Sequence, residues 1–386
     1  MLRPRVCFVV DSGTDVRLAD ALAERTTLRI LARRLGSGRE ISQPSRHALN
    51  VEVGPGSHLA FGWFVIRRLL ALRKETDVVV VQGYGPAAAC ANLVGRLTGR
   101  QVLMLVCSPV EAYYRCRRSG PGARPYRPFE YVVIKVFSSI NAWLGRGYIV
   151  LSPYLASVVR AHGTRQPVDV IPVYGVDRDV FRPSPESKAA IRKRLGLPGS
   201  LPIVFFSSRV APEKDADTVL RAVGILAESG RPVRLLHLSG GHRELIDLAT
   251  SLGVEGHVIA GDAVVPFAPL AEHYRASDVC VQSSREEGLG FSPLEALACG
   301  VPVVATAVGG LNDTIRNGET GWQVPVGDAG ALARAIVDVL DHPVEAARRT
   351  AVGARHVGEA YDRHVVFDAL IDRLSRSASS RRAVQC

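Results

Sequence analysis

Two acidic residues, Glu287 and Glu295, stand eight positions apart around a stretch that contains two glycines. Ionised carboxylates only accept hydrogen bonds, so this pair suits a ligand that carries hydroxyl groups. Gly288 and Gly290 let the backbone N–H groups approach a ligand closely, at the start of an expected helix where anions are favoured. Taken singly, Glu287 could instead be a solvated loop acid, and Glu295 a carboxylate that stabilises a helix N-terminus.

The elements that position these acids follow a simple alternation. Nearly continuous apolar runs are typical of strands covered on both faces. They occur at 5–11, 77–83, 101–108, 147–152 and 168–173, and again at 201–209, 233–240, 257–262, 276–284 and 300–307. The segments 17–35 and 87–99 between them are expected to be helices that end at glycine. Repeated alternation of this kind predicts parallel sheets with helices on both faces.

The length of 386 residues suits two domains rather than one core. A segment rich in proline, glycine and charge, 173–200, separates the two series of strands, and we interpret it as a linker with an entry helix. We therefore expect an N-terminal domain at 1–172 and a C-terminal domain at 201–357. A helix at about 358–378 would pack back on the first domain, and 379–386 would be a frayed tail.

Composition excludes several classes of protein. The net charge is +11, but we find neither a basic stripe nor a recognition motif, so nucleic-acid binding is not expected. The seven cysteines form no Cys-x-x-Cys pair and no zinc-like cluster, which fits reduced thiols. No apolar stretch is long enough for a signal peptide or a membrane span, so we expect a cytoplasmic protein.

The second half resembles the retaining glycosyltransferases of family 4. The resemblance rests on Glu287 and Glu295 followed by Gly300, Pro302, Val303 and Val304, and on the segments 170–183, 207–222, 274–284 and 307–328. It covers nearly all of 168–340. It implies the GT-B arrangement, an α/β fold in which two Rossmann-like, doubly wound parallel-sheet domains face each other across a cleft. It also implies a nucleotide-diphosphate sugar as the donor.

The resemblance assigns roles to individual residues. Glu287 would accept hydrogen bonds from the donor sugar and Glu295 from the ribose hydroxyls. Arg209 and Lys214 occupy the diphosphate-binding positions, where two fixed cations would stabilise the charge that grows on the leaving group. The expected catalytic residues are thus Arg209, Lys214 and Glu287. The expected donor site comprises Gly13, Arg209, Lys214, Glu287, Gly288, Leu289, Gly290, Phe291, Ser292 and Glu295.

Two Asp-x-Asp triplets, 177–179 and 215–217, raise the question of a metal. One falls in the linker and the other at an expected helix start, where aspartate caps the helix. We therefore expect no metal and no cofactor beyond the nucleotide sugar, with Arg209 and Lys214 in the electrostatic role of a metal. Retaining members of this family are discussed as front-face enzymes, in which the leaving phosphate takes the acceptor proton.

The first half departs from the family pattern. A Gly-Gly turn after the first strand is replaced by Ser12-Gly13, so Gly13 is either the residue that reaches the donor phosphate or part of an ordinary turn. The place of a histidine near the reacting centre is taken by Cys107, beside Ser108. Cys107 has no visible neighbouring base, so a buried thiol is favoured over a nucleophile.

The acceptor side is expected in 108–137, which combines arginines with tyrosines. We expect Cys107, Ser108, Tyr113 and Arg115 to face the acceptor. Arginine with aromatics suits a sugar that carries phosphate or carboxylate, including a lipid-phosphate carrier. The alternative is a solvated basic loop. The segment 58–74 is apolar nearly all round a helical wheel, which favours a packed helix over one that lies on a membrane.

The sequence thus predicts a metal-independent, retaining hexosyltransferase-type enzyme of polysaccharide or glycolipid biosynthesis. It would move a sugar to a hydroxyl of a glycan, glycolipid or lipid-linked acceptor, with peripheral contact at the inner face of the cell membrane. Two alternatives stay open at this stage. One is a GT-B epimerase that turns over a sugar nucleotide without an acceptor, and the other is a catalytically silent homologue that binds glycan or lipid.

Overall fold

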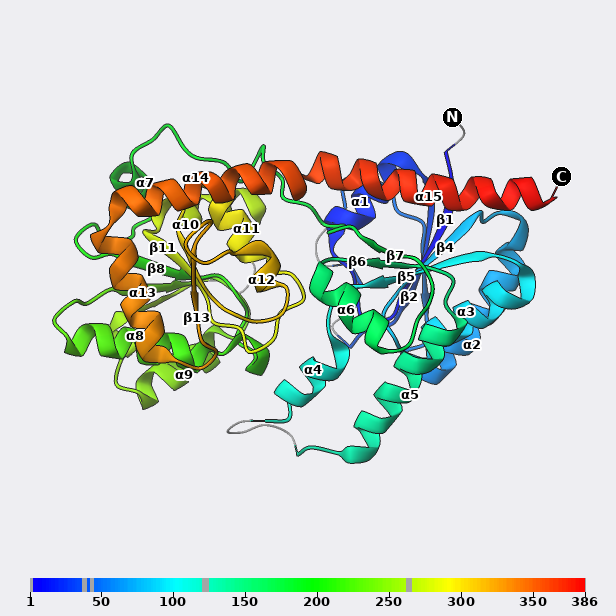
Figure 1. Ribbon diagram of the computed structural model, residues 1–386, viewed down its shortest axis with the longest axis horizontal. Coiled ribbons are helices and arrows are strands. Elements are labelled where there is room, and N and C mark those ends of the chain that lie inside the picture. Colours follow the sequence, from blue (N-terminus) through cyan, green and yellow to red (C-terminus); the bar gives the residue numbers. More distant parts are fainter. Residues whose placement is uncertain (1–2, 37–39, 42–44, 120–124, 262–265, 386) are drawn as a thin grey trace. The chain divides into compact units, whose positions relative to one another are not determined.

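The computed structural model describes residues 3–36, 40–41, 45–119, 125–261 and 266–385, with only the helical backbone given for 380–385. The chain divides into two compact units. The first comprises residues 1–111, 127–175 and 363–386, and the second comprises residues 112–126 and 176–362. Each unit is an α/β domain with a sheet and a hydrophobic core of its own (Figure 1).

The sheet of the first unit has seven strands among the described residues, and all neighbouring strands are parallel. Their order is β3-β2-β1-β4-β5-β6-β7. The central strands are runs of apolar residues buried on both faces, as a parallel sheet between helices requires. The strands are β1 (Arg5–Val10), β2 (Thr27–Arg33), β3 (Val51–Gly54), β4 (Val78–Gln82), β5 (Gln101–Val106), β6 (Tyr148–Val150) and β7 (Val168–Val170).

Helices cover both faces of this sheet (Figure 1). Serine side chains cap two of them, with Ser57 accepting from an N–H of α2 and Ser152 from one of α6. Gly99 ends α3 in the left-handed conformation that glycine adopts without strain. The helices are α1 (Val16–Arg25), α2 (His58–Ala71), η1 (Leu72–Lys74), α3 (Pro86–Thr98), α4 (Val110–Cys116, of which 112–116 lie in the second unit), α5 (Pro128–Leu144), α6 (Pro153–Ala161) and α15 (Arg363–Gln385).

The second unit repeats the plan with six parallel strands in the order β10-β9-β8-β11-β12-β13. The strands are β8 (Ile203–Phe206), β9 (Arg234–His237), β10 (Val258–Ala260), β11 (Val279–Gln282), β12 (Val303–Thr306) and β13 (Trp322–Val324). Its core joins these strands to α8 and α13. The helices are α7 (Lys188–Arg194), η2 (Pro212–Lys214), α8 (Ala216–Glu228), α9 (His242–Ser251), η3 (Glu255–His257), α10 (Phe267–Ala276), α11 (Phe291–Ala298), α12 (Leu311–Thr314), α13 (Ala329–Asp341) and α14 (Pro343–Ala360).

The predicted parallel strands are all present, but one predicted helix is wrong. The segment 17–35 is helical only to Arg25, and 27–33 form strand β2. At the junction, Thr26 turns its hydroxyl back to the carbonyl of Leu22 (2.6 Å) and ends the helix. The residues after it then pair in parallel with β1, so pairing with the sheet outweighs the helical propensity of leucine and arginine.

The C-terminal helix α15 belongs to the first unit. It buries Val366, Leu370 and Leu374 at a helical spacing, and Arg373 Nε donates to Asp169 Oδ2 over 2.6 Å. In the segment 173–200, expected to be a linker with an entry helix, residues 188–194 form α7, and all but 173–175 belong to the second unit. Helix α15 continues to Gln385, where the sequence suggested a frayed tail up to residue 386, which lies outside the described residues.

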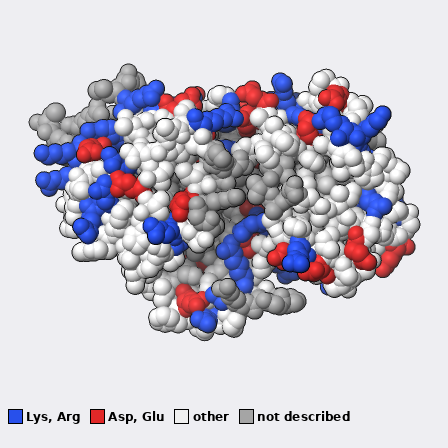
Figure 2. Space-filling model, turned by 180° about the vertical axis from the view of Figure 1, so that it is seen from behind, with Lys and Arg blue, Asp and Glu red and all other residues white. Residues whose placement is uncertain are grey.

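Charge is distributed over the surface in pairs. Figure 2 shows one side of the molecule, where many red carboxylates lie next to blue arginines and lysines, between white areas without charge. The described ion pairs include Arg5 with Asp77 (2.7 Å) and Arg373 with Asp169 (2.6 Å). Of the helices that the structure describes, none has the length and apolar character needed to cross a membrane.

Candidate active site

The predicted donor residues of the second half gather at one edge of the second sheet. Parallel strands β8, β11 and β12 are neighbours, so the loops that follow their carboxyl ends meet at the same edge. These loops span residues 207–215, 283–290 and 307–310. Ligands of doubly wound sheets bind at this edge, which makes it the natural place for a site.

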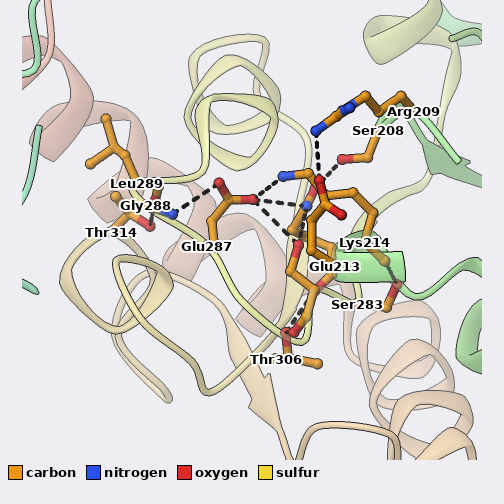
Figure 3. Close-up of polar contacts among 12 residues, drawn as sticks. Ser208, Arg209, Glu213, Lys214, Ser283, Glu287, Gly288, Leu289, Thr306 and Thr314 are labelled. Atoms are coloured by element: carbon orange, nitrogen blue, oxygen red, sulfur yellow. Dashed lines mark hydrogen bonds and ion pairs between the residues drawn. The ribbon is translucent and has the colours of Figure 1, made fainter. Parts of the chain in front are cut away.

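Lys214 and Glu287 point toward each other at this edge (Figure 3). The ammonium group of Lys214 donates to Glu287 Oε2, and both side chains are largely buried, with 14% and 10% exposed. Ser284 Oγ (3.3 Å) and Gln282 Nε2 (3.4 Å) also donate to Oε2, while the N–H of Gly288 donates to Oε1 (3.2 Å). Glu287 is therefore not the solvated loop acid of the alternative interpretation.

A second acid, Glu213, lies next to this pair and is fully buried. It accepts from Arg209 Nη2 over 2.6 Å and from Arg117 Nη2 over 2.8 Å. Burial raises the pKa of Glu213, but the hydrogen bond from Arg117 and the charges of both arginines outweigh it, so the pKa lies below its ordinary value. The same bond raises the pKa of Arg117. The carboxylate therefore fixes Arg209, whose side chain remains about half exposed (53%).

The glycine loop keeps its shape through close backbone contacts. Gly290 precedes α11 with a φ of 94°, a conformation that glycine adopts without strain. The N–H of Gly310 donates to the carbonyl of Glu287 over 2.9 Å. A Cβ atom added at Gly310 would lie only 2.2 Å from the carbonyl oxygen of Gly288, so position 310 has no room for a side chain.

Glu295 lies inside α11, beyond its first turn, and is buried, with only 5% of its surface exposed. The hydroxyl of Tyr274 donates to its Oε2 (3.2 Å) and also contacts Ser207 Oγ (2.9 Å). The alternative that Glu295 only stabilises the helix N-terminus is therefore wrong. Its carboxylate connects α11 to Tyr274 of α10, whose hydroxyl in turn contacts Ser207 after β8.

Both carboxylates of the Asp-x-Asp triplet at 215–217 are engaged in contacts with other side chains. Asp215 has a φ of 52°, and its carboxylate accepts from Thr218 (2.7 Å) and pairs with Arg285 (3.0 Å). Asp217 pairs with Arg221 over 2.7 Å. Among the described residues, no three His, Cys, Asp or Glu side chains are grouped as metal ligands.

Tyr113 and Arg115 belong to the second unit, whereas Cys107 and Ser108 belong to the first. Burial raises the pKa of Tyr113, and the negative charges of Glu287 and Glu213 raise it further. The guanidinium of Arg117 lies over the Tyr113 ring at 5.4 Å from its centre. Arg115 is exposed on α4. Tyr113 is thus part of the Glu213–Glu287 cluster, and residues 120–124 of this segment lie outside the described part.

Cys107 and Ser108 line a cavity of about 510 Å³ in the first unit. The cavity lies at the carboxyl ends of β1, β4 and β5, and its polar lining also includes Ser12, Gln82 and His58. Val133, Ile134 and Phe137 of α5 form an apolar wall. The cavity can therefore hold a molecule that is polar at one end and apolar at the other.

The cysteine in this cavity is a thiol and not a thiolate. Burial raises the pKa of Cys107 to about 12, and its Sγ lies 3.2 Å from the hydroxyl of Tyr174. The structure also brings His58, from α2, to the same cavity, with Nδ1 3.1 Å from Asp11 Oδ1. Sequence reasoning looked for a histidine only near Cys107 and missed this one.

Gly13 lies at the carboxyl end of β1, in the first unit. Its φ is 82°, and its carbonyl accepts from Gln82 Nε2 over 3.2 Å. The turn therefore needs a glycine for conformational reasons alone.

The structure connects the rest of the predicted donor segment to this edge. Leu289 is buried, and its carbonyl accepts from Thr314 Oγ1 over 3.4 Å, while Phe291 and Ser292 open α11. Sequence reasoning missed Glu213 and Tyr274, and it counted Arg117 only among the arginines of 108–137 on the acceptor side. An acid four residues after Arg209 and next to Lys214 was the one available signal for Glu213.

The fold is that of the GT-B class, as comparison with solved structures shows. Sucrose-phosphate synthase from Thermosynechococcus elongatus superposes with a TM-score of 0.78 at 22% identity, covering 98% of this chain and 100% of that one. Anabaena HepE in complex with UDP gives 0.75 at 18% identity, with 96% and 100% covered. The predicted pair of Rossmann-like, parallel-sheet domains is confirmed.

Within this class, residues 187–357 match the family model described as glycosyl transferases group 1. The D-inositol 3-phosphate glycosyltransferase of Thermobispora bispora is 36% identical over 193 residues, which are 47% of this chain and 44% of that protein. The GDP-mannose-dependent alpha-(1-6)-phosphatidylinositol monomannoside mannosyltransferase of Mycolicibacterium smegmatis is 38% identical over 191 residues, 47% of this chain and 49% of that protein. The chain thus spans less than half the length of these relatives. The segment that matches the family model, 187–357, contains Arg209, Lys214, Glu287 and Glu295.

Proposed function

We propose that this protein is a glycosyltransferase of family 4 that moves a sugar from a nucleotide-diphosphate-sugar donor to a hydroxyl group. The observation that carries the proposal is the pairing of Lys214 with Glu287 beside Arg209 and Glu213. These groups lie at the carboxyl ends of β8 and β11, within the segment that matches the group 1 glycosyl transferases. A site with two cations and several hydrogen-bond acceptors suits a diphosphate that is linked to hydroxyl-rich sugars.

The ion pairs explain how the site is kept ready for a donor. Lys214 and Arg209 are held by carboxylates, so neither cation has to be ordered when the donor arrives. The diphosphate competes for Lys214 and for the exposed part of Arg209, and Glu287 then turns its acceptor oxygens to the sugar hydroxyls. Glu295 takes the ribose hydroxyls, with Tyr274 fixing its orientation. Gly288 and the start of α11 contribute backbone N–H groups.

In the proposed reaction the configuration at the anomeric carbon is retained. The bond from that carbon to the diphosphate oxygen breaks, and the bond to the acceptor oxygen forms on the same face of the sugar. The acceptor proton passes to the leaving diphosphate, so no protein base is required. Arg209 and Lys214 stabilise the developing negative charge without a metal. A lost oxyanion donor in other enzymes costs about 2.7–4 kcal/mol of barrier, which sets the scale for each cation.

We place the acceptor in the cavity of the first unit, with Cys107, Ser108 and His58 at its polar end. An amphiphilic cavity of about 510 Å³ supports a glycan, glycolipid or lipid-linked acceptor. The names of two relatives, which state inositol 3-phosphate and phosphatidylinositol monomannoside, support an acceptor that carries phosphate. Such an acceptor is consistent with a cytoplasmic enzyme that works in peripheral contact with the inner face of the membrane.

The test starts with the donor. Thermal unfolding is recorded with UDP-, GDP-, ADP- and dTDP-sugars, and donor hydrolysis is assayed in parallel. We expect one nucleotide series to raise the melting temperature, and the NMR spectrum of the transfer product to show the donor's anomeric configuration. Lys214→Ala and Glu287→Ala should abolish transfer while the fold is kept.

Three results would contradict the proposal or part of it. Full activity in either variant would remove that residue from the mechanism. Loss of activity in EDTA that manganese or magnesium restores would overturn metal independence. Formation of a new sugar nucleotide without any acceptor would indicate an epimerase instead.

A further inference from the structure

Three neighbouring helices of the first unit turn apolar side chains outward. Helix α3 packs between α2 and α5, and the three form one layer (Figure 1). Large apolar side chains are exposed along each of them. We call this set the apolar face: Leu59, Trp63 and Leu70 of α2, Leu93 and Leu97 of α3, and Phe129, Val132, Val136, Ile140 and Trp143 of α5.

The spacing on each helix shows that the exposure is organised. On α5 the exposed residues recur every three or four positions, while Ser138, Asn141 and Ala142 on the other side are buried. On α2, Leu59 and Trp63 point outward, and Phe61 and Gly62 between them are buried. Leu59, Leu97 and Phe129 are 75–78% exposed. Monomeric soluble proteins seldom expose apolar side chains in such number on adjacent helices, so the face has a binding role.

Basic residues outnumber acidic ones on these helices. The three helices contain the basic residues Arg67, Arg68, Arg96 and Lys135 but one acidic residue, Glu130. That acid pairs with Arg127, which directly precedes α5 (3.3 Å). The guanidinium of Arg96 lies over the ring of Trp143, 5.6 Å from its centre, and the ammonium of Lys135 lies 5.9 Å from the centre of the Tyr131 ring. Cations beside amphipathic aromatic rings are typical of surfaces that lie in the headgroup region of a membrane.

We propose that the apolar face binds the surface of a bilayer that contains anionic lipids. Its apolar side chains would enter the boundary between headgroups and acyl chains, and Arg67, Arg96 and Lys135 would contact lipid phosphates, whereas Arg68 is paired with Glu52 (2.6 Å). A second copy of this chain is a poorer partner, since a symmetric pair would set Arg67, Arg96 and Lys135 against their copies, while Glu130 is already paired with Arg127. The purpose of such binding rests on the proposed function, which places the acceptor in the cavity of the first unit. Helix α5 forms the apolar wall of that cavity and Leu59 of α2 also lines it, so the helices of the apolar face adjoin the proposed acceptor site.

Vesicle binding tests the inference without any sugar nucleotide. The full chain is mixed with vesicles of phosphatidylcholine alone or of phosphatidylcholine with phosphatidylglycerol, and bound protein is separated by flotation. We expect binding to the anionic vesicles. The double variant Phe129→Gln/Trp143→Gln should bind at least about tenfold more weakly, since two exposed apolar side chains are lost. Val344→Gln is the matched control, because Val344 is 84% exposed on α14 of the second unit and should not matter.

The tryptophans provide a second measurement. Trp63 and Trp143 belong to the apolar face, whereas Trp322 is buried in the second unit. Emission should shift to shorter wavelength when anionic vesicles are added, and Trp63→Phe/Trp143→Phe should show no shift. Arg67→Glu/Lys135→Glu should lower binding to anionic vesicles by about tenfold and leave phosphatidylcholine vesicles unaffected.

The failures can be told apart. If the unaltered chain binds neither vesicle, or if Phe129→Gln/Trp143→Gln binds as well as Val344→Gln, the inference is wrong. If the chain sediments as a dimer that the same double variant converts to a monomer, the face is an interface between copies instead. Donor hydrolysis in the same preparations reports on the glycosyltransferase site independently, so vesicle binding without hydrolysis would refute the proposed function and leave this inference standing.

Discussion

The ion pair between Lys214 and Glu287 can be tested by a double-mutant cycle. The variants are Lys214→Met, Glu287→Gln and the two combined, each in a Trp63→Phe/Trp143→Phe background. In that background Trp322, which lies in the second unit, is the remaining tryptophan of the three. Its emission then follows the unfolding of the unit that contains the pair, which avoids mixing the two units in one transition.

The structure sets the expected size of the effect. A hydrogen bond to a charged group contributes about 1.5–3 kcal/mol, and breaking a buried pair by removing one partner costs about 3–5 kcal/mol. Without Lys214, the Glu287 carboxylate would still accept hydrogen bonds from three uncharged donors, and its side chain is 10% exposed. The expected cost therefore lies in the range for a hydrogen bond to a charged group and not in the range for a buried charge left alone. We expect Lys214→Met to lower the free energy of unfolding by about 2–3 kcal/mol and Glu287→Gln by about 1–2 kcal/mol. The double variant should be more stable than the sum predicts, by about 1–2 kcal/mol.

Urea unfolding at neutral pH measures these energies. Lys188→Met is the control, because Lys188 Nζ pairs with Asp278 over 2.7 Å but is 44% exposed. Its substitution should cost less than about 1 kcal/mol. Strict additivity of the two single variants, within about 0.5 kcal/mol, would show that the pair contributes no net coupling energy and would contradict this prediction. For donor turnover, each single variant should lower kcat/KM by about a hundredfold or more. The kcat/KM of the double variant should be only slightly lower than that of the less active single variant.

Three further predictions concern the surroundings of the site. Gly310→Ala should destabilise the protein by about 1–3 kcal/mol and remove most donor turnover, because its Cβ would overlap the carbonyl of Gly288, whereas Gly256→Ala, with nothing within 4 Å, should change neither in the same assays. Cys107 should resist iodoacetamide at pH 8, since a pKa of about 12 leaves roughly one thiolate in ten thousand, and mass spectrometry that finds it rapidly labelled would contradict this. The folded protein lowers the pKa of Glu213, so its ionised carboxylate stabilises the fold above the unfolded pKa and loses this effect as the pH falls through the folded value. The difference in unfolding free energy from Glu213→Gln should therefore be constant above about pH 5 and shrink in acid, and a difference independent of pH would contradict the assignment.

Much of the fold could be predicted because the central strands carry a strong local signal. Runs such as Val78–Gln82 are apolar on both faces, and only a parallel sheet between helices buries both. Strands β2, β3 and β13 lack that signal. Strand β3 has four residues and β13 has three. Strand β2 directly follows α1, and its leucines and arginines resemble those of the helix. Their pairing with the sheet, which is a nonlocal contact, decides their conformation.

The candidate site divides in the same way. The spacing of Glu287 from Glu295, and of Arg209 from Lys214, is local and visible in the sequence. The side chains that these residues contact are not visible in the sequence. Arg117 reaches Glu213 across 96 positions, and Lys214 reaches Glu287 across 73. Such contacts arise only when strand order places distant loops at one edge of a sheet.

The sequence by itself determined the two series of parallel strands and the residue types that gather at the second sheet. It could not decide which apolar residues lie inside. Helix α2 is apolar nearly all round, and the tertiary structure alone shows that Phe61, Val65 and Leu69 pack inward while Leu59 and Trp63 remain in contact with solvent. The physical reason is that hydrophobicity drives burial without specifying a partner, so the assignment of faces depends on which helices the rest of the chain places alongside.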